Sequence, residues 1–273
     1  TWAWQTMGER GEAVTTNFDP QTTNRVRFYI GCYRPAQWRH FERVMVSVNQ
    51  LPKRKLHVFH DCIMDSGAFT ALSSGRGHRP VEEYARIIEH WAGSGISAAV
   101  SQDYMCEPFI LAKAREHGLS NGTVAHHQTL TIERYDWLME LSSSIYVMPV
   151  LQGYEPQDYL NHLAAYGERL QSGMWVGVGS VCKRNSNVRE VERVLWPIHQ
   201  ARPDLRLHGF GIKLSALKSA LVQDCLYSCD SMAASYGERR KGRDANSAEA
   251  FLRYAKRIEM LGHRPATIPM GGI

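Results

Sequence analysis

Three aspartates stand where short strand-like segments of this sequence end, which is the position at which α/β enzymes present catalytic groups. Two nearby carboxylates can divide the chemistry of glycosyl transfer, because one attacks the anomeric carbon while the other handles the proton of the leaving or entering group. A third carboxylate and an amide can then recognise a base through hydrogen bonds. Three carboxylates could alternatively bind a divalent metal ion. The aspartates are Asp65, Asp103 and Asp230, and the amide is that of Gln152.

The segment DSGAF at residues 65–69 combines several groups that a ligand site needs. Gly67 lets the backbone turn after a strand, and Phe69 offers a flat apolar face for a planar ligand. Taken alone, the segment is better explained by an ordinary turn next to a core phenylalanine. The functional interpretation gains support because polar residues and glycines recur at the other strand ends, at positions 102–103, 152–153, 177–180, 208–211 and 230–231.

The elements that must position these groups alternate along the chain. Strands are expected over residues 27–31, 57–64, 96–101, 145–151, 174–179, 205–211 and 225–229. An eighth strand is expected either near residues 123–126 or around residues 44–48. Helical patterns are expected over residues 80–92, 156–170, 187–201, 214–223 and 246–261.

This alternation predicts an α/β fold with a parallel sheet and helices outside it. Eight strands would close into a (β/α)8 TIM barrel, which typically takes about 250 residues. An open doubly wound sheet is the alternative, and the lack of a Gly-x-Gly-x-x-Gly segment at a helix start weighs against its dinucleotide-binding form. We expect residues 1–25 to form an N-terminal extension and residues 26–273 to form one catalytic barrel domain.

The composition is that of a globular chain, with 273 residues of which 44% are hydrophobic. No apolar run approaches the ~20 residues that span a bilayer, and the first residues lack the apolar core of a signal peptide, so we expect a cytoplasmic location without membrane contact. The six cysteines form no Cys-x-x-Cys pair, which argues for reduced thiols and against a structural zinc. No metal ion and no cofactor are expected.

The formal net charge of +5 favours a polyanionic partner such as nucleic acid. Two basic clusters follow expected strand ends, and if they border the same face of the barrel they are well placed for backbone phosphates. The alternative for each cluster is an ordinary solvated surface. The clusters consist of Lys183 and Arg184, and of Arg239, Arg240, Lys241 and Arg243.

Six segments, taken in order, resemble the tRNA-guanine transglycosylase superfamily, and within it the DpdA-like enzymes of phages and bacteria that insert 7-deazaguanines into DNA. The segments are DSGAF at 65–69, QD at 102–103, VLQG at 150–153, VGVG at 176–179, LHGFG at 207–211 and CDSMA at 229–233. The resemblance covers roughly residues 26–243. It implies a (β/α)8 barrel that exchanges guanine in DNA for a 7-deazaguanine base, such as preQ0 or a derivative, without breaking the sugar–phosphate backbone.

The resemblance also implies roles for the residues that match the motifs of the family. Asp230 would be the nucleophile that attacks C1′ of the deoxyribose and forms a covalent intermediate. Asp65 would handle the proton of the reacting base. Asp103 would accept hydrogen bonds from N1–H and the amino group of guanine.

The remaining base-binding residues follow from the same match. Gln152 and the backbone N–H of Gly179 would bind the carbonyl of the base, and Ser66 belongs to the same set. Phe69 would stack on one face of the base. His208 stands where the tRNA enzymes usually have a methionine, so the opposite face of the base would be covered differently.

Two departures favour DNA over tRNA as the substrate. The chain lacks the Cys-x-Cys-x-x-Cys zinc motif of the tRNA enzymes, and Asp230 is followed by Ser-Met-Ala instead of Pro-Thr-Arg. Three alternatives stay open: a tRNA-guanine transglycosylase without zinc, a metal-dependent barrel hydrolase and a non-catalytic nucleic-acid-binding barrel. The hydrolase is disfavoured because the adjacent pair His126 and His127 is expected to begin a loop. The oligomeric state is left open.

Overall fold

The computed structural model describes residues 26–32, 34–55, 58–141, 144–184 and 187–261. The side chains of residues 36 and 183 lie outside this description. The expected N-terminal extension, residues 1–25, also lies outside it, so the proposed division of the chain stays a prediction.

The strands form a single parallel sheet that closes on itself. Their hydrogen-bonded order is β5-β4-β3-β2-β1-β9-β8-β7-β6. The two strands at the ends of this order, β5 (Tyr146–Met148) and β6 (Val150–Leu151), are consecutive in the chain and are separated only by Pro149, which has no N–H for the ladder. Because β5 pairs with β4 and β6 pairs with β7, they are two halves of one strand that closes the ring. The expected (β/α)8 barrel is therefore confirmed.

The other strands are close to the expected ranges. They are β1 (Arg27–Gly31), β2 (Arg43–Ser47), β3 (Asp61–Asp65), β4 (Ile96–Val100), β7 (Trp175–Val178), β8 (Arg206–Gly209) and β9 (Ser228–Ser231). The expected strand over 57–64 is shorter at its start, where residue 57 lies outside the described residues. The expected strand over 225–229 is wrong at its start, because Ser219 caps a helix that runs on to Cys225.

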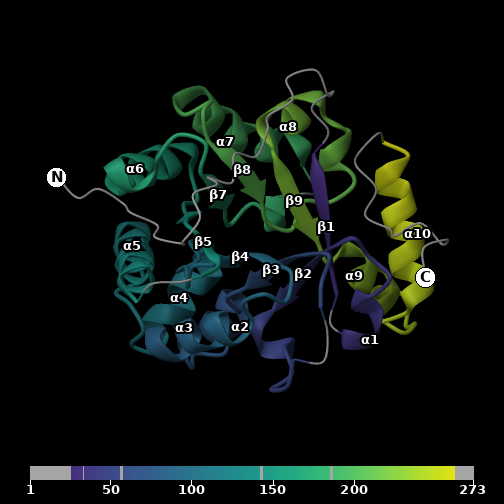
Figure 1. The fold of residues 1–273 in the computed structure, drawn as a ribbon. Coiled ribbons are helices and arrows are strands. Elements are labelled where there is room, and N and C mark those ends of the chain that lie inside the picture. Colours follow the sequence, from purple (N-terminus) through teal and green to yellow (C-terminus); the bar gives the residue numbers. More distant parts are fainter. Residues whose placement is uncertain (1–25, 33, 56–57, 142–143, 185–186, 262–273) are drawn as a thin grey trace, which may run out of the picture.

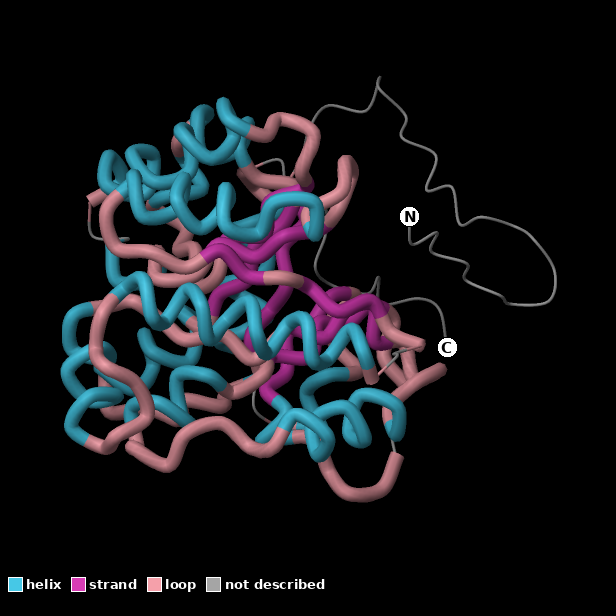
Figure 2. Tube along the Cα trace, turned by 90° about the vertical axis from the view of Figure 1, so that its left-hand side faces the viewer, coloured by secondary structure: helices cyan, strands magenta, loops and turns pink. Residues whose placement is uncertain are grey.

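Helices surround the strands (Figure 1), and Figure 2 shows the strands as a central core between them. The helices are α1 (Pro35–Trp38), α2 (Ala68–Ser73), α3 (Val81–His90), α4 (Pro108–Glu116), α5 (Val124–Glu140), α6 (Pro156–Tyr166), α7 (Val188–Ala201), α8 (Ala220–Cys225), α9 (Ala233–Arg240) and α10 (Ala248–Glu259). Short 3-10 helices lie at Val48–Gln50, Gly167–Arg169, Cys182–Arg184 and Ala216–Lys218. No helix in the described part of the chain is long and apolar enough to cross a membrane.

The eighth strand is β2, which agrees with the expectation around residues 44–48. The alternative near residues 123–126 is wrong, because the hydroxyl of Thr123 accepts a hydrogen bond from the N–H of His126 and so caps the start of α5. His126 and His127 accordingly lie in the first turn of a helix and not in a loop.

The strands bury side chains on both faces, so the barrel has an inner and an outer core. Tyr29 and Ile63 point into the barrel and pack with inward-facing residues of other strands. Their neighbours Phe28 and Met64 belong to the layer between strands and helices. This alternation along β1 and β3 rigidly fixes the direction in which each strand leaves the barrel, and with it the position of the residues that follow.

Candidate active site

Polar residues at the carboxyl ends of the strands meet at one end of the barrel, because all strands run parallel around a closed ring. Asp65 is the last residue of β3, and Asp230 lies within β9. The charge of Asp230 raises the pKa of Asp65, and the charge of Asp65 raises the pKa of Asp103. The three carboxylates therefore lie close enough to interact. Gln152 directly follows β6 and His208 lies in β8, so the structure gathers these sequence-selected residues at one end.

Asp230 is almost fully buried and is held through one of its two oxygens. Its Oδ1 accepts a hydrogen bond of 2.9 Å from the N–H of Gly211, and Nε2 of His208 lies 3.4 Å from the same oxygen. Gly211 has φ +66°, and a Cβ there would lie 2.6 Å from Cβ of Cys182, so only glycine fits this turn. Within the described residues Oδ2 has no hydrogen-bond partner, which leaves it available for attack on a substrate.

Asp65 holds its proton more tightly than an ordinary carboxylic acid does. Burial and the neighbouring charge of Asp230 raise its pKa to about 6, although hydrogen bonds from Ser47 and from the N–H of Gly67 lower it. The N–H of Gly67 lies 3.2 Å from Oδ2. Ser47 is the residue paired with Asp65 in the register of β2 and β3, a contact that no local sequence pattern predicts. A carboxyl group with this pKa can both release and accept a proton near neutral pH.

Asp103 lies three residues beyond β4 and is also buried. Burial raises its pKa to about 7, against the effect of a hydrogen bond that Nε2 of Gln152 donates to Oδ2. The hydroxyl of Ser66 lies 3.5 Å from Oδ1. Nε2 of His78 lies 2.9 Å from the backbone carbonyl oxygen of Asp103, which ties the 74–79 loop to this strand end.

Gln152 is fully buried, and its surroundings fix the orientation of its amide. The hydroxyl of Ser180 donates to Oε1 over 2.7 Å, so the amide NH2 must face Asp103. The backbone of Gln152 is held on both sides. Its N–H donates to Nδ1 of His162, and its carbonyl oxygen accepts from the amide of Gln128.

Gly179 has no side chain, and this leaves room for the amide of Gln152. A Cβ at this position would lie 2.1 Å from Nε2 of Gln152, so the amide can occupy its place only beside a glycine. The N–H of Gly179 donates to the carbonyl oxygen of Leu151 over 2.9 Å, within the barrel ladder. This differs from the expectation that this N–H binds the carbonyl of a base, because its hydrogen bond is already used by the sheet.

Ser180 is a residue of the site that the sequence places at a strand end but to which no role was assigned. It is buried and has φ +57°, a backbone conformation that costs a non-glycine residue about 1 kcal/mol or more. Its hydroxyl oxygen accepts from the N–H of Cys106 and lies 3.0 Å from Oε2 of Glu107. Ser180 thus joins the end of β7 to the segment that follows Asp103.

Two residues expected to cover the faces of a base differ in exposure. The side chain of Phe69, in α2, is 48% exposed, and its ring centroid lies 6.3 Å from that of Phe109 at the start of α4. His208 is fully buried beneath Asp230. Its ring presents no open face, so stacking on a base would require this part of the barrel to rearrange.

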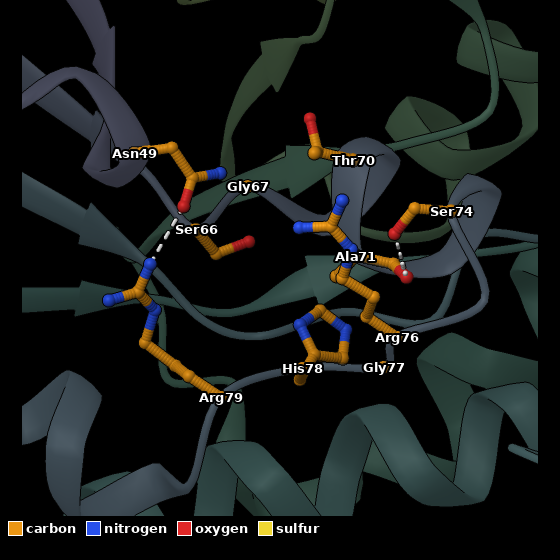
Figure 3. A pocket seen from close by; sticks show the side chains of 10 residues that line it. All are labelled: Asn49, Ser66, Gly67, Thr70, Ala71, Ser74, Arg76, Gly77, His78 and Arg79. Atoms are coloured by element: carbon orange, nitrogen blue, oxygen red, sulfur yellow. Dashed lines mark hydrogen bonds between the residues drawn. The ribbon is translucent and has the colours of Figure 1, made fainter.

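A polar hollow of about 280 Å³ opens beside Ser66 (Figure 3). Its lining residues are Asn49, Ser66, Gly67, Thr70, Ala71, Ser74, Arg76, Gly77, His78 and Arg79. The guanidinium of Arg79 is held by Asn49 at 2.7 Å and by Glu83 at 3.2 Å. Arg76 is exposed and forms no ion pair with any described residue. Figure 3 shows the two arginines on either side of the hollow, with Ser66 between them.

The first basic cluster selected from the sequence is largely engaged inside the protein. The side chain of Arg184 is 10% exposed; it pairs with Glu190 at 3.4 Å, lies 4.5 Å from the ring centroid of Tyr154 and donates to the carbonyl oxygen of Tyr154. The side chain of Lys183 lies outside the described part of the chain.

The second basic cluster lies at the end of α9. Arg239, Arg240 and Lys241 are exposed and form no ion pair within the described ranges, whereas Arg243 pairs with Glu238 at 2.8 Å. The segment after this cluster is joined to the loop that follows β1, because Asp244 pairs with Arg34 at 3.7 Å. Within the described residues, no group of three or more histidine, cysteine or acidic side chains is arranged to hold a metal ion.

Comparison with protein families supplies an independent finding. Residues 25–260 match the family model DpdA, described as DeoxyPurine in DNA protein A. The matched range includes every strand of the barrel and all the site residues described above. A search of curated proteins found no matching relative.

The raised pKa of Asp103 predicts that this residue destabilises the fold at alkaline pH. A carboxyl group whose folded pKa lies near 7, above its ordinary value of 3.8, favours the folded state at low pH and loses that contribution as pH rises through about 7. Asp103→Asn should therefore raise the melting temperature at about pH 8, and the gain should shrink at about pH 5. One pKa unit corresponds to about 1.4 kcal/mol, so the gain is a few kcal/mol at most.

Asp204→Asn is the matched control, because Arg202 lowers the pKa of that exposed carboxyl group and the substitution should give no gain at about pH 8. An Asp103→Asn protein that is no more stable than the wild type at about pH 8 would contradict the prediction.

Proposed function

The chain belongs to the DpdA family, and we propose that it exchanges guanine in DNA for a 7-deazaguanine base of the preQ0 type. Family membership implies a transglycosylase of the pentosyltransferase kind that acts on DNA. One observation supports the specific reaction most strongly: Asp230 has one oxygen held and the other without a partner among the described residues, beside Asp65, whose pKa is raised to about 6. These are the environments that a nucleophile and a proton-transfer group require.

The exchange proceeds by two displacements at C1′ of the deoxyribose. In the first, Oδ2 of Asp230 forms a bond to C1′, the bond from C1′ to N9 of guanine breaks, and the departing guanine keeps the electron pair and takes a proton from Asp65. In the second, N9 of the incoming 7-deazaguanine attacks C1′ and gives its proton to Asp65, while the electron pair of the ester bond returns to Asp230. Two inversions restore the original configuration.

The charge of Asp230 regulates the proton on Asp65 during these steps. While Asp230 is ionised it raises the pKa of Asp65, which favours the protonated acid needed for the first displacement. Formation of the sugar ester removes that charge, so the pKa of Asp65 falls and its ionised form becomes the base for the second displacement. One carboxyl group can thus serve both steps.

Asp103 and Gln152 select the base. An ionised Asp103 accepts hydrogen bonds from N1–H and the amino group of guanine, groups that adenine does not offer in this arrangement. The amide NH2 of Gln152 faces Asp103, because Ser180 holds Oε1, and its second N–H can donate to the carbonyl of the base. The same edge is present in 7-deazaguanines, so one pocket serves both the leaving and the entering base.

The target guanine must leave the helical stack before Asp230 can reach C1′, at a cost of a few kcal/mol. Stacking on Phe69 would recover part of this cost, because a base on an aromatic ring contributes about 1–3 kcal/mol. Arg76, at the hollow next to Ser66, is proposed to bind a phosphate beside the extruded nucleotide. Further phosphates would be bound by the exposed residues Arg239, Arg240 and Lys241. The internal contacts of Arg184 make it a residue that supports the site and not a phosphate ligand.

Substitution of Asp230 tests the reaction. Asp230→Asn should bind DNA but should neither incorporate a labelled 7-cyano-7-deazaguanine nor form a covalent protein–DNA adduct, because an amide is a far weaker nucleophile. Nucleoside mass spectrometry of the DNA measures the incorporation, and denaturing gels measure the adduct.

Asp224→Asn, an exposed aspartate on α8, is the matched control and should keep full activity. Parallel assays on DNA and on tRNA show which of the two is the substrate. Incorporation into tRNA but not into DNA, or full activity of Asp230→Asn, would contradict the proposal.

The two raised pKa values predict a narrow pH optimum. Base binding needs ionised Asp103 and so increases as pH rises through about 7, whereas the first displacement needs protonated Asp65 and so declines as pH rises above about 6. The value of kcat/KM should therefore be highest between these two values and fall toward both about pH 5 and about pH 8. A profile that is flat over this range would contradict the assignment of the two carboxyl groups.

Removal of a phosphate contact should change the salt dependence of DNA binding. Arg76→Ala should reduce the slope of log K against log salt concentration by about 0.7–0.9, the value for one phosphate contact. Arg202→Ala is the control, because this arginine pairs with Asp204 just ahead of β8, at the opposite end of the barrel from the strand ends that carry the site. Equal slopes for the two variants, measured by fluorescence anisotropy over a range of salt concentrations, would exclude Arg76 from the phosphate path.

A further inference from the structure

Asp230 is the end of a line of polar side chains that crosses three neighbouring strands inside the barrel. Nε1 of Trp175 lies 2.7 Å from the hydroxyl oxygen of Ser228, and that hydroxyl lies 2.8 Å from Nδ1 of His208. Nε2 of His208 then lies 3.4 Å from Oδ1 of Asp230. The register of β8 and β9 sets His208 directly opposite Ser228, so the contact follows from the closure of the barrel.

The chemistry of these groups fixes the direction of each hydrogen bond. The indole of Trp175 can only donate, so the oxygen of Ser228 accepts from it. The hydroxyl hydrogen of Ser228 then needs an acceptor, and among the described residues only Nδ1 of His208 is in place. A histidine whose Nδ1 accepts carries its proton on Nε2, and Nε2 lies 3.4 Å from Oδ1 of Asp230 without a hydrogen-bond partner among the described residues.

The opposite tautomer would be costly in this setting. A proton on Nδ1 would leave the buried hydroxyl of Ser228 without an acceptor and would turn the lone pair of Nε2 toward a carboxylate oxygen. Both His208 and Ser228 are completely buried, so water does not relieve either penalty. The rings of Trp175 and Phe210, with centroids 6.0 and 4.9 Å from that of His208, hold the imidazole in place.

We propose that His208 is a positioning residue for Asp230, with its Nε2–H tautomer fixed by Ser228 and Trp175. The proposal rests on the proposed exchange reaction. The N–H of Gly211 holds Oδ1, and a hydrogen bond from Nε2 of His208 to the same oxygen would leave Oδ2 for C1′ of the sugar. At 3.4 Å this contact is not yet a hydrogen bond, and a small shift of Asp230 or His208 when the substrate binds would complete it, as is common for catalytic contacts in free enzymes.

This arrangement affects the two displacements unequally. In the sugar ester Oδ1 is an uncharged carbonyl oxygen, whereas negative charge returns to the carboxylate as the bond from C1′ to Oδ2 breaks. Donors at Oδ1 therefore assist the breakdown of the ester more than its formation. Loss of the His208 donor should slow release of the modified DNA and let the covalent adduct accumulate.

Two substitutions at this position separate a hydrogen-bonding role from a packing role. His208→Gln can offer an amide N–H near the position of Nε2, whereas His208→Phe keeps an aromatic ring but has no donor. We expect His208→Phe to lower kcat about 10- to 100-fold, the range for one hydrogen bond to a charged group, with a larger fraction of enzyme in the covalent adduct. His208→Gln should keep most of the activity. A packing role predicts the reverse order, because phenylalanine suits the aromatic surroundings better than glutamine.

Nitrogen NMR of the full-length protein labelled in its histidines tests the tautomer without relying on activity. The signal absent from His208→Gln identifies His208, which should show a protonated Nε2 and an unprotonated Nδ1. In Ser228→Ala the partner of Nδ1 is removed, so the second tautomer should appear. A protonated Nδ1 in the wild type would overturn the proposal, as would equal kcat values for wild type, His208→Phe and His208→Gln.

The wild-type assay keeps the two proposals distinct. Absence of both base exchange and covalent adduct in the wild type counts against the proposed function, and the NMR result then decides the hydrogen-bond direction alone. Thermal unfolding of each variant shows whether a loss of activity comes from misfolding. If a His208 variant is misfolded, the tautomer and kcat of Ser228→Ala supply the test of the positioning role.

Discussion

Mutual repulsion and burial of three carboxyl groups at one end of the barrel govern the rest of this site. Asp65 and Asp103 have pKa values raised to about 6 and about 7, because they are buried and lie near other negative charges. Hydrogen-bond donors around the carboxylates fix the orientation of individual oxygens. Asp230 receives the N–H of Gly211 at one oxygen, and Asp103 receives the amide of Gln152. The site thus holds, within one small volume, two carboxyl groups that can gain or lose a proton near neutral pH, as the proposed transfer of a proton between Asp65 and the nucleobase requires.

The closed barrel makes such an arrangement possible. A buried carboxylate needs partners in fixed places, and strands that are hydrogen-bonded on both sides supply them from neighbouring positions. Ser47 is placed opposite Asp65 by the register of β2 and β3, and Ser228 is placed opposite His208 by the register of β8 and β9. The break at Pro149 divides the closing strand into two parts, of which the second leads directly into Gln152.

The fold and the central carboxylates could be predicted from the sequence because their signals are local. The strand-like segments predict the barrel, and the aspartates at their ends, such as Asp65 and Asp103, predict the location of the site. The contacts by which Ser180 orients Gln152 and Ser228 orients His208 have no such signal, because they join residues far apart in the chain: 28 positions separate Ser180 from Gln152, and 53 separate Ser228 from Trp175. Prediction from local sequence patterns also fails where a single capping residue determines the type of element. The Thr123 side chain caps α5, so a segment with a strand-like sequence begins a helix instead.

Asp65 connects the two polar networks of the site, and this gives the proposed reaction its order. On one side Asp103 contacts Gln152 and through it Ser180; on the other, Asp230 contacts His208. Repulsion is reciprocal, so a guanine edge that keeps Asp103 ionised also helps to keep a proton on Asp65. Formation of the ester at Asp230 then removes one of the charges that held this proton. Binding of the base therefore prepares the acid before attack, and the attack itself prepares the base for the second displacement.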